Sequence, residues 1–173
     1  MRSTAKVALT SLLGALMLAV VSCGSKDSGS GAAGVAVSSV STRKSEPSIS
    51  GTPNPDLQKR YGISVPKSAT NASFGHLQVE GGGDLWVSFK TGKDDLDIFL
   101  SGLGIDEEDM TPGVAAFTSR DLEMTGWFID PMHPVKGIMS PAKEGDMKSP
   151  SHKVTVDYAD PGSMTVYILA GKP

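Results

Sequence analysis

The uneven distribution of large apolar side chains is the feature that most constrains how this chain can fold. Both tryptophans, all three tyrosines and all five phenylalanines lie at or beyond Tyr61. Residues 24–53 are mostly Gly, Ser, Thr and Pro, a composition that buries too little apolar surface to offset the entropy lost on ordering. The sequence therefore predicts one globular domain over residues 54–173, a typical domain length, after a flexible linker over residues 23–53.

Two β-hairpins are predicted within this domain. Alternating apolar residues indicate strands over Phe74–Glu80 and Leu85–Thr91, joined by a glycine-rich turn. A second pair, Lys153–Tyr158 and Met164–Ala170, surrounds Asp160-Pro161-Gly162, in which Pro presets φ and Gly accepts either sign of φ.

Helical signals are fewer. The most regular apolar stripe, at helical spacing, consists of Leu96, Phe99, Leu100 and Leu103. Short helices are also predicted after Asn54-Pro55 and near Ser119–Thr125. The predicted fold is a small single α+β domain, an antiparallel sheet of two β-hairpins with one main amphipathic helix packed on it. Residues 126–151 lack a clear period, although a strand near Phe128 or Ile138 can be hidden there.

The N-terminus has the pattern of a signal peptide. Arg2 and Lys6 precede an apolar run over Val7–Val21, and small residues follow. As a helix this run spans about 22 Å, less than the roughly 30 Å of a bilayer's hydrocarbon core. We therefore expect residues 1–22 to be cleaved and not to form a permanent membrane span.

The end of this run resembles the lipobox of bacterial lipoproteins. An aliphatic residue, Val20, stands three places before the predicted cut, the small Ser22 just before it, and Cys23 follows. The resemblance, which covers residues 1–24 only, implies cleavage between Ser22 and Cys23 and attachment of diacylglycerol to the Cys23 thiol. It also implies anchoring at the extracytoplasmic face of the cell membrane. The folded domain resembles no family that its residues identify.

Charge and cysteine content exclude some classes of protein. The formal net charge is −3, and loss of Arg2 and Lys6 with the leader makes the mature chain more acidic. No basic stripe is present to displace the counterions of a nucleic acid, so we expect no such partner. Because Cys23 is the only cysteine, no disulfide can form within one chain, and the fold must depend on its core.

The densest mixture of aromatic and polar groups lies between Gly126 and Ser151. There Trp127 can supply a stacking surface, Asp130 an acceptor or charge, and His133 a titratable donor or acceptor. These three residues are the predicted ligand-binding site. The alternative is structural: Trp127 and Phe128 anchor the loop to the core while the neighbouring prolines stiffen it.

Other chemistry has weaker support. The sequence contains no nucleophile elbow, zinc-helix motif, phosphate loop or dinucleotide fingerprint, so no catalytic residue, metal ligand or cofactor is assigned. A hydrolase site could still assemble in space around His76, His133 or His152. Thioether ligands suit Cu(I), which keeps open a copper-handling role for His133, His152 and the five methionines at 110, 124, 132, 139 and 147. The acids at 94, 95, 97 and 106–109 are interpreted as a helix first turn and a solvated face.

Together these patterns predict a surface lipoprotein, not an enzyme, whose domain is a binding or interaction module for an unknown ligand. Its expected partners are membrane lipid, through Cys23, and an unidentified envelope component or protein. An exported copper-handling protein and an envelope hydrolase remain the alternatives.

Overall fold

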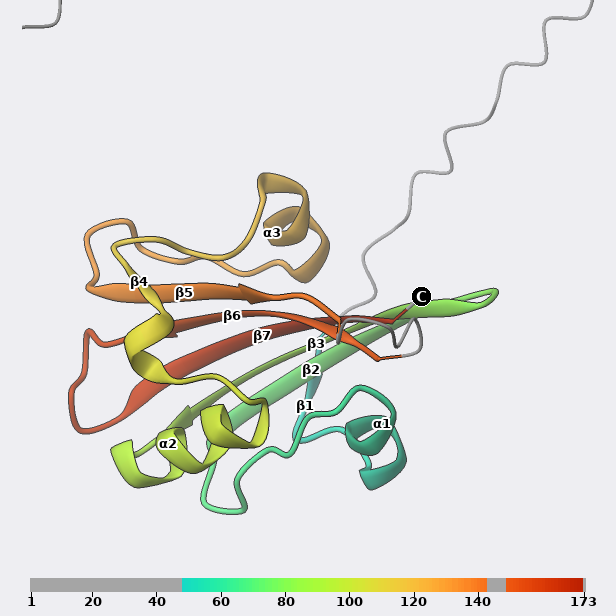
Figure 1. Cartoon of the computed structure of the whole chain (residues 1–173), viewed down its shortest axis with the longest axis horizontal. Coiled ribbons are helices and arrows are strands. Elements are labelled where there is room, and N and C mark those ends of the chain that lie inside the picture. Colours follow the sequence, from blue (N-terminus) through green and yellow to red (C-terminus); the bar gives the residue numbers. More distant parts are fainter. Residues whose placement is uncertain (1–47, 143–148, 173) are drawn as a thin grey trace, which may run out of the picture. The chain divides into compact units, whose positions relative to one another are not determined.

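One antiparallel β-sheet dominates the part of the chain that the structure describes. The computed structural model describes residues 48–142 and 149–172. The predicted signal peptide and the lipobox residues Val20, Ser22 and Cys23 lie outside these ranges. Seven strands follow the order β1-β2-β3-β7-β6-β5-β4 across the sheet (Figure 1). The strands are β1 (Ile49–Ser50), β2 (Thr70–Val79), β3 (Gly82–Thr91), β4 (Thr111–Pro112), β5 (Val135–Ser140), β6 (Ser151–Asp157) and β7 (Met164–Lys172).

The predicted fold, two hairpins covered by one main amphipathic helix, is wrong. Both expected hairpins form, β2 with β3 and β6 with β7. However, β3 also pairs with β7 from Gly83↔Lys172 to Thr91↔Met164, so the hairpins belong to one continuous sheet. Strands β5 and β4 extend this sheet at one side, and β1 extends it at the other. The described helices are short: α1 (Pro55–Arg60), α2 (Lys93–Gly102), α3 (Ser119–Thr125) and the 3₁₀ turn η1 (Glu107–Asp109).

The sequence of β5 lacks a clear strand pattern because its buried residues lie on both faces of the sheet. Val135 and Gly137 are buried on one face, whereas Ile138 packs against the core on the other. A Cβ atom at Gly137 would lie 2.4 Å from the Val114 carbonyl oxygen, so backbone and not a large side chain fills that position. Met139 is exposed. The strand therefore lacks the apolar alternation by which a half-buried strand is recognised.

The two short helices predicted from capping residues are confirmed. The Asn54 side-chain oxygen accepts a hydrogen bond from Leu57 N at 2.9 Å, and Pro55 is the first residue of α1. Thr118 and Asp121 form a reciprocal capping box at the start of α3. Both arrangements satisfy N–H groups that a helix leaves free at its N-terminus.

The helices cover opposite faces of the sheet (Figure 1). On the core face, the buried side chains of β3, β6 and β7, such as Val87, Val154 and Ile168, belong to one cluster with Leu96 and Phe99 of α2. On the other face, which we call the α3 face, polar contacts attach the segment from 113 to 134 to β6. Lys153 Nζ lies 2.7 Å from Asp121 Oδ2 of α3, and Ala116 N donates to Thr155 Oγ1 at 2.9 Å. One sheet thus supports two separate layers.

Strand β1 comes from the segment predicted as a linker. Ile49 pairs with Phe74 and Ser50 with Ser73, both on β2. The chain then crosses to α1 on the core face, and this crossing positions one wall of the site described next.

Candidate functional site

Trp127 lies in an aromatic cluster on the α3 face. Gly126, with φ of 69°, ends α3 and turns the chain toward the sheet. The Trp127 ring centroid is 5.1 Å from that of Phe117 and 5.2 Å from that of Tyr167 on β7. The indole is half-buried, whereas the next residue, Phe128, is 78% exposed. Trp127 therefore attaches the loop to the sheet, as the structural alternative expected, and Phe128 does not.

The structure brings Asp130 and His133 together. Asp130 Oδ1 accepts from Met132 N at 2.9 Å, which closes a tight turn, and its other carboxylate oxygen is 3.8 Å from His133 Nε2. On the opposite side of the ring, His133 Nδ1 lies 2.8 Å from Asp157 Oδ2 at the end of β6. The hydrogen bond to Asp157 and the charges of both carboxylates raise the pKa of His133. The imidazole thus links the loop to the sheet between two acids.

The other two histidines contact Tyr61 instead. His76 Nε2 is 3.0 Å from the Tyr61 hydroxyl, and His152 Nε2 donates to the Tyr61 carbonyl oxygen at 2.8 Å. Burial lowers the pKa of both rings. Among the described residues, the polar partners of His133 are two carboxylates and no serine hydroxyl is among them.

The methionines that were candidate copper ligands differ in their burial. Met110 is buried in the core, Met132 and Met139 are exposed, and Met147 lies outside the described residues.

Glu107, from the acidic run, is not a solvated side chain but lies between Lys93 and Lys136, at 2.8 and 2.7 Å. These contacts hold the pKa of Glu107 down at about 2. Within residues 48–142 and 149–172, no group of three or more His, Cys, Asp or Glu side chains is placed to hold a metal ion.

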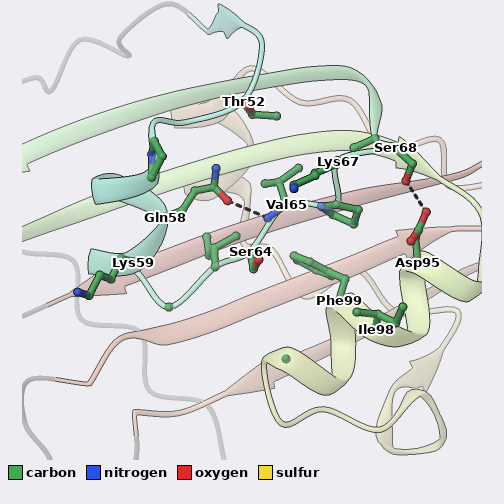
Figure 2. A pocket seen from close by; sticks show the side chains of 16 residues that line it. Thr52, Gln58, Lys59, Ser64, Val65, Lys67, Ser68, Asp95, Ile98 and Phe99 are labelled. Atoms are coloured by element: carbon green, nitrogen blue, oxygen red, sulfur yellow. Dashed lines mark hydrogen bonds between the residues drawn. The ribbon is translucent and has the colours of Figure 1, made fainter.

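A groove that the sequence did not indicate lies on the other side of the sheet, between α1 and α2. It has a volume of about 1160 Å³ and is lined by α1, by the segment 62–69 that follows it, and by α2 (Figure 2). We call it the α1–α2 groove. All of its lining residues belong to the continuous described range from 48 to 142.

Gln58 holds one wall of the groove in place. Its side-chain oxygen accepts from Val65 N at 2.9 Å (Figure 2). Its amide nitrogen donates to the Pro53 carbonyl oxygen at 2.8 Å. The Gln58 carbonyl oxygen also accepts from Ile63 N at 2.9 Å. One residue of α1 thus fixes the extended segment 63–65, which turns Ile63 and Val65 inward and leaves Ser64 exposed.

The opposite wall is formed by α2, from Asp95 to Gly102. Phe99 is buried at the floor, whereas Ile98 is 69% exposed although it also lines the groove (Figure 2). The Ser68 hydroxyl donates to Asp95, which connects the two walls. In the sequence, Ile98 could have indicated this groove, because it is a large apolar residue of α2 outside the stripe that faces the core.

No protein-family model matches the chain, and no curated protein or solved structure matches it either. The described helices include none long and apolar enough to span a membrane.

Proposed function

We propose that this chain is a membrane-anchored surface lipoprotein whose domain is a non-enzymatic binding module, and that the α1–α2 groove is its binding site. The observation that carries the proposal is the groove, a concavity of about 1160 Å³ with the apolar residues Ile63, Val65 and Phe99 among its lining. Ligand sites in proteins are typically concave and mostly apolar, with a few polar groups.

The groove is a better candidate than the loop at Trp127 because the loop's side chains already have partners. Trp127 packs on Tyr167, His133 is bonded to Asp157, and Asp130 closes its own turn. Ile98 exposes most of its apolar surface to solvent and lines the groove, whereas Phe128 of the loop is also exposed but does not line it. Exposed apolar surface beside a concavity is a common mark of an interaction site.

The anchor is supported by the sequence of residues 1–24. The lipobox resemblance places lipid on Cys23, and the Gly- and Ser-rich composition that follows suits a tether between lipid and domain. Stable attachment by lipid requires more than one acyl chain, and a diacylglycerol supplies two.

The binding of Nile red, a neutral apolar fluorescent dye, tests the groove. The full chain carrying Cys23→Ser avoids the need for detergent, and in this background we expect saturable enhancement of the dye's fluorescence. Ile98→Glu should weaken binding about tenfold or more, since a charge at the mouth of an apolar site is costly to desolvate. Because Ile98 is an exposed helical residue, the substitution leaves the core intact.

Phe128→Glu is the matched control, because Phe128 is equally apolar and exposed but lies in the loop on the α3 face. We expect it to leave dye binding unchanged. If Phe128→Glu abolished binding while Ile98→Glu had no effect, the loop would be the apolar site and the proposal for the groove would be wrong.

A further inference from the structure

The charged side chains that line the α1–α2 groove include more cations than anions. Lys59 and Lys67 both line it and are exposed, and within the described part of the chain neither forms an ion pair. The acid that lines the groove, Asp95, accepts a hydrogen bond from Ser68. In a chain with net charge −3, two lysines that line one concavity and have no ion pair among the described residues favour an anion there.

The same groove offers apolar surface to a hydrocarbon chain. Its lining residues Ile63, Val65 and Phe99 are buried, whereas Ile98 presents exposed apolar surface on α2. Figure 2 shows Ile98 beside Phe99. The volume of about 1160 Å³ lies above the roughly 300–1,000 Å³ typical of pockets for compact small molecules. A ligand of ordinary small-molecule size therefore fits within it.

We infer that the α1–α2 groove binds an anionic amphiphile, a molecule with one long apolar chain and a carboxylate or phosphate head. The chain packs against Ile98, which is exposed beside the buried Ile63, Val65 and Phe99, and the head is attracted by Lys59 and Lys67. The inference rests on the proposed function, because it specifies the ligand of the same groove. Charge complementarity selects the acidic head over a neutral or cationic one.

Calorimetric titration of four ligands with the same twelve-carbon chain tests this. Dodecanoate and dodecyl phosphate carry anionic heads, dodecanol a neutral one and dodecyltrimethylammonium a cationic one. The ionic ligands are used below their micelle-forming concentrations and dodecanol below its solubility limit. With the full chain carrying Cys23→Ser, we expect the anions to bind about three- to tenfold more tightly than dodecanol, since exposed charge pairs contribute only modestly in water. The cation should bind most weakly. The order of the two anions identifies the preferred head.

The double variant Lys59→Gln, Lys67→Gln separates the charge contribution from the apolar contribution. It should reduce the affinity for dodecanoate to that for dodecanol and leave dodecanol binding unchanged. Lys90→Gln is the matched control, because Lys90 also has no ion pair among the described residues but lies on β3 away from the groove. It should change neither affinity.

The two proposals fail in different ways. Equal affinity for anionic, neutral and cationic heads, or no effect of the double variant, would overturn the inference but leave the groove as an apolar site. Absence of binding by all four ligands, together with no effect of Ile98→Glu on Nile red, would overturn the proposed function as well.

Discussion

At Gly75, on β2, the absence of a side chain leaves room for the indole of Trp86 on the neighbouring strand β3. A Cβ atom at Gly75 would lie 2.2 Å from Trp86 Cε2, and Trp86 is only 1% exposed, so the ring has little space to move. We predict that Gly75→Ala lowers the free energy of unfolding by about 1–3 kcal/mol, as overpacking of a close-packed site does. Urea denaturation measures the change.

Gly102→Ala is the control for this substitution. Gly102 is the last residue of α2, and no atom lies within 4 Å of a Cβ built there. Alanine is favoured over glycine in a helix by up to about 1 kcal/mol, so we expect no loss of stability. Similar losses from both variants would show that the contact with Trp86 is not the cause.

The loop between α3 and β5 is an element whose attachment depends on pH. The Asp157 and Asp130 carboxylates raise the pKa of His133 above its ordinary value of 6.5 in the folded chain. The stabilisation by protonated His133 is therefore fully present below about pH 6.5 and is lost as the pH rises through the raised folded-state pKa. We predict that the stability difference between wild type and His133→Gln is larger near pH 5.5 than near pH 8, as measured by urea denaturation at a series of pH values.

Asp157→Asn tests whether this carboxylate is the cause. It retains His133 and an oxygen acceptor but removes the negative charge of the carboxylate 2.8 Å from the ring, so the pH dependence assigned to His133 should shrink. Burial lowers the pKa of His152, so His152 contributes a pH dependence of stability with the opposite sign. This contribution is the same in every variant and therefore cancels when the variants are compared. An unchanged profile in Asp157→Asn would contradict this explanation.

For the molecule as a whole, the proposed lipid anchor predicts where the chain is found in the cell. Wild type should sediment with membranes and incorporate radiolabelled palmitate, whereas Cys23→Ser should do neither, since no other cysteine is available for a thioether. Cell fractionation and autoradiography measure both properties. Ser22→Ala, which keeps a small residue before the cut, should behave as wild type, and membrane-bound, labelled Cys23→Ser protein would show that the anchor lies elsewhere.

Local structure was predictable where short-range chemistry decides it. Asn54 and Pro55 begin α1, and Thr118 with Asp121 begins α3, because each pair acts within one helical turn. The turn Asp160-Pro161-Gly162 likewise joins β6 to β7. The candidate site at Asp130 and His133 was partly predictable, since their pairing is a local turn, whereas their contact with Asp157 is not local.

By itself, the sequence determined the segments of regular structure that have their own period or caps, and the concentration of apolar residues beyond Tyr61. Only the tertiary structure decided that β3 and β7 pair to make one sheet, that Gly137 of β5 fits beneath the backbone of Val114, and that Gln58 fixes Val65 opposite α2. Each of these depends on residues distant in the chain meeting across a strand or a groove. Composition and periodicity describe neighbours along the chain, so they contain no information about such meetings.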